Sequence, residues 1–294
     1  MRTLNFRNGL GVSPLGYGAG HVGQDSLDED FVGSLLNQVV DLGINFLDTA
    51  RGYGKSEERI GRHLSWRRKD YILSTKVGYL VEGYDDWTYD GIRAGIEQAL
   101  NRMRTDHIDV VFLHSCDLWH LEKGEVVKAL VQCRDEGLIG ATGYSGENES
   151  LRFALNSGAF DVVQCSVNFT DHKSLKELLP PYTGKIGVVA KRPLANAPWR
   201  HIAEPHGEYC HPYWLRMKAM GLDRLKPAEL EWNEFALRFT LGVPQVSTAI
   251  VGSLNIENIQ ANWAAAQKGP LNTGLYNAVR TAFDEKGAQW SGEI

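Results

Sequence analysis

Short apolar, β-branched runs recur along the chain, and an amphipathic stretch follows each of them. The runs predict buried strands, and the stretches repeat their apolar residues with the period of a helix. The predicted strands span residues 12–18, 44–48, 71–77, 108–114, 139–145, 161–166, 187–192 and 247–251. The predicted helices span residues 31–42, 57–64, 91–103, 126–136, 149–156, 175–179, 230–241 and 256–267. Eight β/α units in strict alternation predict an α/β fold whose parallel strands close into a (β/α)8 TIM barrel.

Two segments lie outside this alternation. Residues 4–12 carry Asn8-Gly9 between apolar flanks, which predicts an N-terminal β-hairpin. Residues 193–228 form a long loop after strand 7, and a loop of that length in a compact domain is usually functional. Since no shift in composition marks a boundary, we expect residues 1–294 to form a single (β/α)8 barrel domain. We expect the first helix to begin with a capping box of Ser26 and Glu29 and to end at Gly43.

The composition narrows the class of protein. With 43% apolar and 23% charged residues and a net charge of -5, the chain has the profile of a soluble globular protein rather than of a disordered or coiled-coil one. Lys and Arg are scattered, so we expect no nucleic-acid partner. No apolar run approaches the ~18 residues of a membrane span, and no signal peptide is recognisable, so we expect no membrane partner. The cysteines form no C-x-x-C pair, which favours a reducing, cytoplasmic location.

Polar residues stand at the carboxyl ends of the predicted strands, where a barrel of this kind gathers its function. Alternate residues of a strand share a face, so Asp48, Lys76 and His114 are expected to point toward the same mouth. Tyr53 follows Asp48 closely, and its flanking glycines let the loop turn back over the strand end. The strand-end set comprises Asp48, Lys76, His114, Ser145, Gln164, Ser166, Asn168, Lys191, Arg192, Gly252 and Ser253.

An acid, a lysine, a tyrosine and a histidine that converge in this way form a proton-transfer device. Tyr53 is the expected general acid; since a free phenol has a pKa of about 10, a nearby ammonium, that of Lys76, must stabilise the phenolate. Asp48 would keep Lys76 charged, and His114 would donate a hydrogen bond to a substrate carbonyl oxygen. The sequence shows no nucleophile with an activating base. These groups handle only a proton, which implies that a bound nicotinamide supplies the hydride.

Five motifs around these residues follow one another along the chain: Gly43-Ile44-Asn45-Phe46-Leu47-Asp48-Thr49-Ala50, Tyr53-Gly54, Ser56-Glu57, Ser74-Thr75-Lys76 and Asp109-Val110-Val111-Phe112-Leu113-His114. Together they resemble the aldo-keto reductase superfamily in its bacterial type. The resemblance runs in order from about Leu10 to Asn262 and implies a (β/α)8 barrel that catalyses NAD(P)H-dependent interconversion of a carbonyl (aldehyde, ketone or aldose) and an alcohol. It assigns Tyr53 as acid/base, Lys76 and Asp48 as its tuning pair, and His114 as the group that orients the carbonyl.

The resemblance also implies a dinucleotide site. Ser145 and Gln164 would contact the nicotinamide carboxamide, Leu194 and its neighbours the pyrophosphate, and Ser253 and Asn262 the adenosine end. NADP is expected from the family's usage, although residues 254–258 supply no Lys or Arg for a 2′-phosphate, so NAD stays open. The expected cofactor-binding set is Gly18, Ala19, Gly20, Ser145, Gln164, Arg192, Pro193, Leu194, Gly252, Ser253, Asn258 and Asn262.

Two positions depart from the family's pattern. Ser145-Gly146 stands where many members have Ser-Asn, and Lys191-Arg192 stands where many have an aromatic residue that stacks on the nicotinamide. We hypothesise that Arg192 turns toward the pyrophosphate, because a guanidinium fork suits phosphate oxygens. About half of a set of aromatic residues is expected to wall the substrate pocket. This set is Trp87, Trp119, Trp199, Tyr213 and Trp214.

Two further motifs in the sequence do not have the spacing that their usual functions need. The run from Gly18 to Gly23 matches the G-x-G-x-x-G dinucleotide pattern, but three residues intervene before the helix, and eight units exceed the strands of a doubly wound sheet. Candidate metal ligands in the long loop fit no zinc spacing, so no metal is expected. These candidates are His201, His206, His211, Glu208 and Cys210.

The sequence is also compatible with two alternative functions, and a third is disfavoured. One is a sugar dehydrogenase that runs in the oxidative direction with NAD, and another is a nucleotide-binding regulatory subunit on the same fold. A metal-dependent barrel hydrolase would need several ligands at strand ends, where only His114 and Asp48 qualify. The sequence names neither the carbonyl or sugar substrate nor the oligomeric state.

Overall fold

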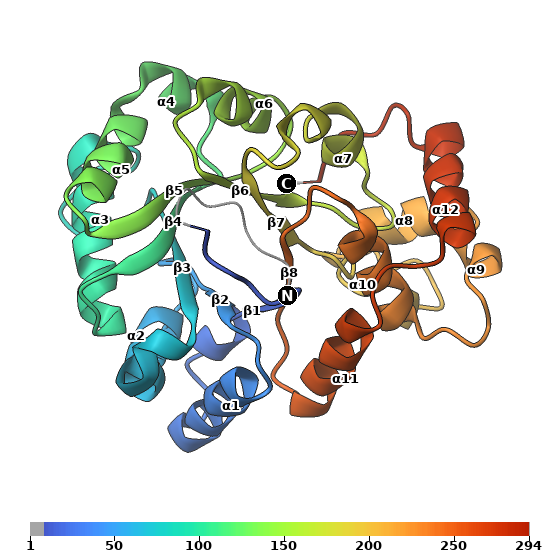
Figure 1. Cartoon of the computed structure of the whole chain (residues 1–294), viewed down its shortest axis with the longest axis horizontal. Helices are drawn as coiled ribbons and strands as arrows, with labels where there is room; N and C mark the ends of the chain where they lie inside the picture. The colour runs from blue at the N-terminus through green and yellow to red at the C-terminus, as the bar shows by residue number, and fades with distance from the viewer. Residues whose placement is uncertain (1–8, 294) are drawn as a thin grey trace.

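The computed structural model describes residues 9–293, and its centre is a closed barrel of eight parallel strands in sequence order (Figure 1). The last strand pairs with the first, so the sheet has no free edge. The predicted (β/α)8 TIM barrel is thereby confirmed, and a doubly wound sheet is excluded. The strands are β1 (Leu15–Gly18), β2 (Phe46–Asp48), β3 (Ile72–Val77), β4 (Ile108–His114), β5 (Ile139–Ser145), β6 (Val162–Ser166), β7 (Gly187–Lys191) and β8 (Thr248–Val251).

Helices surround the barrel, and all eight predicted helices are present with ends within two residues of those expected. They are α1 (Glu29–Asp41), α2 (Ser56–Leu64), α3 (Tyr89–Met103), α5 (Glu125–Asp135), α6 (Asn148–Ser157), α7 (Lys173–Glu177), α10 (Trp232–Gly242) and α11 (Ile256–Gln267). The pattern missed α4 (Leu118–Lys123), α8 (His211–Ala219), α9 (Leu222–Leu225) and α12 (Thr273–Lys286). It also missed the short 3₁₀ helices η1 (His21–Gly23), η2 (Ser65–Asp70), η3 (Pro180–Tyr182) and η4 (Pro198–Arg200).

The long segment after β7 is folded rather than irregular. It contains η4, α8 and α9, and Figure 1 places α8 and α9 at one side of the barrel near α12. The hydrophobic pattern did not predict α8, because one of its three buried residues is the charged Arg216, beside Tyr213 and Met217. The segment therefore forms a small helical layer in which α9 packs against α12.

The start of α1 corrects one sequence expectation. Asp28, not Ser26, is the N-cap, and its Oδ1 accepts a hydrogen bond from the Phe31 amide at 2.9 Å. Glu29 does not close a capping box with Ser26, because its carboxylate binds Arg59 at 2.9 Å. The predicted end is correct: Gly43 follows the C-cap with a φ of +92°.

Apolar side chains fill the interior of the barrel. The apolar interior consists of Val12, Phe46, Ile72, Val110, Phe112, Ala141, Val162 and Val189. A second, larger apolar cluster lies between the strands and the helices. Residues 1–8, which hold most of the predicted hairpin, lie outside the described residues, while Leu10 packs against the interior cluster. Because the interior is filled by apolar side chains, a functional site is expected at the polar carboxyl ends of the strands.

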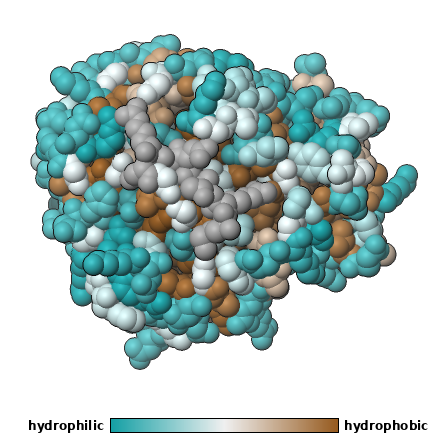
Figure 2. Space-filling view, in the orientation of Figure 1, coloured by the Kyte–Doolittle hydropathy of each residue, from teal (hydrophilic) through white to brown (hydrophobic). Residues whose placement is uncertain are grey.

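The surface drawn in Figure 2 is mainly hydrophilic around its periphery, with apolar residues visible in the gaps between elements. Among residues 9–293, no helix is long and apolar enough to cross a membrane.

Candidate active site

The register of the barrel brings the polar strand ends to one mouth. Asp48 at the end of β2 pairs with Ser74 on β3, and Ser145 at the end of β5 pairs with both His114 on β4 and Gln164 on β6. Parallel strands share the direction of their carboxyl ends, so these side chains lie around one opening. A cavity of about 1090 Å³ opens there, and its wall includes Asp48, Tyr53, Lys76 and His114.

Asp48 and Lys76 form a buried ion pair. The Lys76 ammonium donates to Asp48 Oδ2 at 2.6 Å and to the Thr49 carbonyl at 2.8 Å, and the two side chains are 2% and 3% exposed. Asp48 Oδ1 accepts from Ser74 Oγ at 2.8 Å and from Gln164 Nε2 at 3.0 Å. Burial alone would lower the pKa of Lys76, but the Asp48 carboxylate and Tyr53 raise the pKa above its ordinary value. The lysine is therefore held charged.

Tyr53 lies between this ion pair and His114. Its loop turns at Gly54, which has a φ of +52° that favours glycine, as the sequence predicted for the flanking glycines. The turn leaves the Lys76 ammonium 4.9 Å from the centre of the phenol ring. The His114 ring meets Tyr53 edge-on, with ring centres 5.8 Å apart. The phenol thus contacts both a cation and a hydrogen-bonding imidazole.

His114 is neutral at physiological pH. Burial, together with the positive charges of Lys76 and Lys191, lowers the pKa of His114 to about 3. The Tyr79 hydroxyl lies 2.7 Å from His114 Nδ1. Tyr79 lines the same cavity, and sequence reasoning missed it. The one feature of the sequence that could have indicated Tyr79 is its position just after β3, the strand that carries Lys76.

All but one of the expected cofactor-binding residues line the cavity. Ala19 is the exception: it is buried, its amide donates to the Asp48 carbonyl at 2.7 Å, and its carbonyl accepts from Ser56 Oγ at 2.8 Å. It shapes the turn after β1. The lining residues from that set are Gly18, Gly20, Ser145, Gln164, Arg192, Pro193, Leu194, Gly252, Ser253, Asn258 and Asn262.

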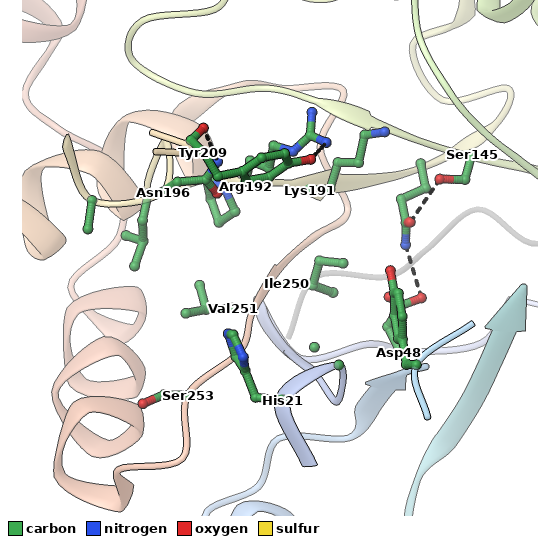
Figure 3. Close-up of a pocket in the computed structure, with 18 of the residues that line it drawn as sticks. His21, Asp48, Ser145, Lys191, Arg192, Asn196, Tyr209, Ile250, Val251 and Ser253 are labelled. Atoms are coloured by element: carbon green, nitrogen blue, oxygen red, sulfur yellow. Dashed lines mark hydrogen bonds between the residues drawn. The ribbon is translucent and has the colours of Figure 1, made fainter. Parts of the chain in front are cut away.

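Ser145 and Gln164 belong to a chain of hydrogen bonds that reaches Asp48. Ser145 Oγ donates to Gln164 Oε1 at 3.0 Å, and Gln164 Nε2 donates to Asp48 Oδ1 at 3.0 Å (Figure 3). Gln164 therefore orients the acid of the ion pair as well as facing the cavity. The link between Gln164 and Asp48 joins residues 116 positions apart, and no local signal in the sequence could have shown it.

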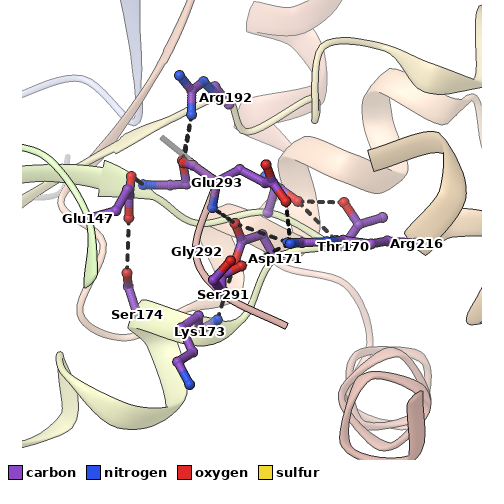
Figure 4. A network of polar contacts seen from close by, with 12 residues as sticks. Glu147, Thr170, Asp171, Lys173, Ser174, Arg192, Arg216, Ser291, Gly292 and Glu293 are labelled. Carbon is purple, nitrogen blue, oxygen red and sulfur yellow. Dashed lines mark hydrogen bonds and ion pairs between the residues drawn. The ribbon is translucent and has the colours of Figure 1, made fainter. Parts of the chain in front are cut away.

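Arg192 is bound by the C-terminal segment. One guanidinium nitrogen donates to the Glu293 carbonyl at 2.7 Å (Figure 4), and another donates to the Tyr209 hydroxyl, whose ring lies 5.1 Å from the guanidinium carbon. The hypothesis that Arg192 holds the pyrophosphate stays a prediction. In this structure two of its guanidinium nitrogens already donate to groups of the protein.

Lys191 also lines the cavity and is paired with a buried acid. Its ammonium lies 3.3 Å from Glu147 Oε1, whose side chain is fully buried. Burial lowers the pKa of Lys191, and the Glu147 carboxylate opposes that shift. A buried ion pair thus occupies the position where many family members have a stacking aromatic residue.

The glycine after Ser145 also has a structural reason. A Cβ on Gly146 would lie 2.2 Å from the Tyr144 hydroxyl oxygen, and that hydroxyl donates to the Cys116 carbonyl at 2.9 Å. Because Tyr144 occupies the space, asparagine would not fit without a shift of this buried tyrosine.

The prediction that about half of five aromatic residues wall the substrate pocket is wrong. None of the five aromatic residues singled out from the sequence lines the cavity, whereas Tyr79 and Tyr209 do. Trp199 instead stacks on Trp232 with ring centres 5.6 Å apart, and Trp214 donates to the His201 carbonyl. The number of aromatics in the segment after β7 reflects the packing of α8 and η4.

One group in this segment has the residue types of a metal site. Ligand atoms of Glu204, His206 and His211 lie within 4.8 Å of one another, and His211 Nε2 is 2.6 Å from Glu204 Oε1. Glu204 and His206 are exposed, and the other candidates from the sequence, His201, Glu208 and Cys210, do not join them. The expectation of no metal stays a prediction.

Comparisons with known proteins point to one family. A sequence profile of the Aldo/keto reductase family matches residues 14–282. L-galactose dehydrogenase of Arabidopsis thaliana is 28% identical, over 90% of this chain and 87% of its own. A probable voltage-gated potassium channel subunit beta of Oryza sativa subsp. japonica is 29% identical, over 91% of each chain. The solved holo form of an aldo-keto reductase from Bacillus halodurans superposes with a TM-score of 0.81 at 26% identity, covering 96% of this chain and 95% of that one. The chain belongs to the aldo/keto reductase family of oxidoreductases.

Proposed function

We propose that this oxidoreductase interconverts a carbonyl compound and an alcohol with NAD(P)H, and that Tyr53 is its general acid and base. The observation that carries the proposal is the position of Tyr53, 4.9 Å from the Lys76 ammonium and beside the His114 ring at one cavity mouth. An ammonium beside a phenol stabilises the negative charge that forms when the phenol gives up its proton, so the tyrosine can serve as proton donor and acceptor.

The four residues divide the work. A nicotinamide bound in the cavity supplies or accepts the hydride. In reduction, Tyr53 donates its proton to the carbonyl oxygen, and Lys76 stabilises the phenolate that remains. Asp48 keeps Lys76 charged, and neutral His114 donates a hydrogen bond that orients the carbonyl oxygen. In oxidation, the Tyr53 phenolate accepts the proton of the alcohol.

The charges of the cavity support a dinucleotide as the cofactor. Among the described residues of its wall, the one acid is Asp48, whose charge is neutralised by Lys76. Lys191 is paired with Glu147, so the excess positive charge of the wall comes from Arg192 and Arg200. A positive wall suits a pyrophosphate. The cavity also extends from Asp48 to Asn262, and its volume of about 1090 Å³ slightly exceeds the roughly 300–1,000 Å³ of most ligand pockets.

The choice between the two nucleotides rests on the far end of the cavity. Family usage favours NADP(H), yet that end is lined by Ser253, Leu254, Asn258 and Asn262, which carry no charge for a 2′-phosphate. We therefore propose a site that accepts NAD(H) as well as NADP(H), with dissociation constants that differ less than about tenfold. A charged hydrogen bond is worth roughly 1.5–3 kcal/mol, so Asn258→Arg should tighten NADP(H) about tenfold or more and leave NAD(H) nearly unchanged.

The substrate class is proposed from the plant relative that is named a sugar dehydrogenase. A small polyhydroxylated aldehyde or sugar suits a mouth lined by Tyr53, Tyr79, His114 and Ser145, which offer several hydrogen-bonding groups. Assays with aldehydes and with free sugars, run in both directions, would decide which direction is faster.

The rice relative supports a second candidate, a regulatory subunit that binds nucleotide and acts through a partner. Turnover separates the two functions, because a sensor needs nucleotide binding but no efficient proton transfer. The presence of Asp48, Tyr53, Lys76 and His114 around one cavity supports the enzyme.

The test combines binding and turnover. We would titrate the protein with NADH and NADPH by fluorescence and assay wild type, Tyr53→Phe and the control Tyr84→Phe, which changes an exposed tyrosine outside the cavity. General acid–base catalysis contributes about 10²–10⁴-fold, so Tyr53→Phe should lose turnover by that factor and keep nucleotide affinity. Binding without any turnover, or turnover indifferent to Tyr53, would favour the regulatory function.

A further inference from the structure

Tyr79 and His114 form a contact that the proton-transfer scheme does not use. The Tyr79 hydroxyl lies 2.7 Å from His114 Nδ1, and the two rings lie 5.3 Å apart and within 24° of parallel. Both residues line the cavity. Nε2, the other imidazole nitrogen, has no hydrogen-bond partner within residues 9–293, so it is the nitrogen available to a substrate.

Only one proton is available for the two nitrogens of His114. Its pKa is lowered to about 3, mainly by burial, so the ring is neutral and one nitrogen carries the proton while the other is an acceptor. If the proton is on Nδ1, then Nε2 presents a lone pair to the carbonyl oxygen, and the two would repel. His114 can orient a carbonyl only when the proton is on Nε2.

The Tyr79 contact selects between these two states. A phenol is a good donor, and the bare nitrogen of an imidazole is a better acceptor than a phenolic oxygen, so the 2.7 Å contact is best satisfied as O–H to Nδ1. Burial raises the pKa of Tyr79, and that shift keeps its proton in place. A hydrogen bond donated to Nδ1 leaves the histidine proton on Nε2.

We propose that Tyr79 is a positioning residue that holds His114 with its proton on Nε2, facing the substrate carbonyl. The role of His114 rests on the function proposed above. The location of its proton is a property of the protein itself and can be measured without any substrate.

Neighbouring groups hold Tyr79 in place for this role. Its ring packs against Trp87, with ring centres 5.8 Å apart, and the Trp87 amide donates to the Gly78 carbonyl at 2.8 Å. The backbone of Gly52 also approaches the Tyr79 ring and hydroxyl, since a Cβ added there would lie 3.5 Å from both. The hydroxyl is therefore supported by the β3–α3 connection and by the loop that carries Tyr53.

Nitrogen-15 NMR of the histidine side chains tests the proposal directly. Uniformly labelled wild type is compared with Tyr79→Phe, and His114→Gln identifies the His114 signals by their loss. We expect wild-type His114 to show its proton on Nε2 and a hydrogen-bonded Nδ1, and Tyr79→Phe to show a mixture of tautomers. A proton on Nδ1 in wild type, or unchanged His114 signals in Tyr79→Phe, would overturn the proposal.

Kinetics add a readout that general damage to the fold would not produce. Removing one aligned hydrogen bond is expected to lower kcat/KM by about ten- to a hundredfold in Tyr79→Phe, through kcat more than through nucleotide affinity. In the His114→Gln background, the same change should cost less than about twofold, because Tyr79 acts through His114. Equal losses in both backgrounds would contradict the proposal.

Tyr84→Phe, in the same connection but exposed, is the matched control and should behave as wild type. A protein without turnover would refute the proposed enzyme and still leave the NMR comparison decisive for Tyr79, so the two failures are distinguishable.

Discussion

Replacing Asp48 by asparagine should destabilise the protein far more than its similar shape suggests. The substitution keeps an oxygen that can accept from Ser74 and Gln164, but it places an amide opposite the Lys76 ammonium, where Oδ2 now lies at 2.6 Å. Both side chains are almost fully buried, so water cannot solvate the orphaned charge. Removing one partner of a buried ion pair costs roughly 3–5 kcal/mol, a large part of a typical unfolding free energy of about 5–15 kcal/mol.

The pH dependence of the loss identifies its cause. Without Asp48, burial lowers the pKa of Lys76 below its ordinary value, so the unfolded state binds more protons than the folded state. Stability then rises with pH, and the deficit of Asp48→Asn should shrink from pH 7 to pH 9 by up to about 1.4 kcal/mol per pH unit. In wild type, the raised pKa of Lys76 keeps its contribution fully present below the unfolded pKa, so no such rise is expected from this group.

Urea unfolding at both pH values, for wild type, Asp48→Asn and Asp48→Asn/Lys76→Met, measures these effects. The double variant removes the orphaned charge and should regain most of the lost stability while staying inactive. A deficit of less than about 1 kcal/mol in Asp48→Asn, or a double variant no more stable than the single one, would refute the assignment of Lys76 as a buried cation held by Asp48.

Three further outcomes are expected. Gly146→Asn should lower stability by about 1–3 kcal/mol, because its side chain meets the Tyr144 hydroxyl; an unchanged urea midpoint would contradict this. The pKa of His114 is lowered to about 3, so the unfolded state gains a proton first on acidification; stability should fall from pH 6.5 downward by up to about 3 kcal/mol at pH 4, and His114→Gln should remove that part of the fall in acid titrations. Removing residues 291–294 takes acceptors from Arg192 and the buried Arg216, so calorimetry should show a Tm lower by several degrees, and an unchanged Tm would show that the tail does not stabilise this wall.

The residues that could be predicted are those whose position follows from strand period alone. Asp48 and His114 are the last residues of β2 and β4, and Lys76 is the last but one of β3, so their meeting at one mouth needs only the barrel and the parity of the strands. The position of Tyr53 requires in addition one turn of the loop after β2, which the positive φ of Gly54 allows. Short-range pattern and topology together suffice for this set.

The partners of these residues depend on contacts that no local pattern contains. Tyr79 reaches His114 from 35 positions away, and Gln164 reaches Asp48 from 116. Helix α8 buries Arg216, so its pattern does not resemble that of an ordinary packed helix. In each case the sequence shows a residue type with hydrogen-bonding capacity, and only the fold decides which group satisfies it.

The two departures from the family pattern are connected through Glu147. Gly146 leaves room for the Tyr144 hydroxyl, and the next residue, Glu147, turns inward with its carboxylate fully buried beside the Lys191 ammonium. A buried carboxylate needs such a cation, because its charge would otherwise be costly. An aromatic residue at position 191 would leave Glu147 with hydrogen bonds from Ser166 and Ser174 but without the Lys191 cation. The lysine and the residues after Ser145 are therefore features of one arrangement. Arg192 extends that arrangement to the carbonyl of Glu293, and this explains why its guanidinium faces the C-terminal segment although its chemistry suits a phosphate.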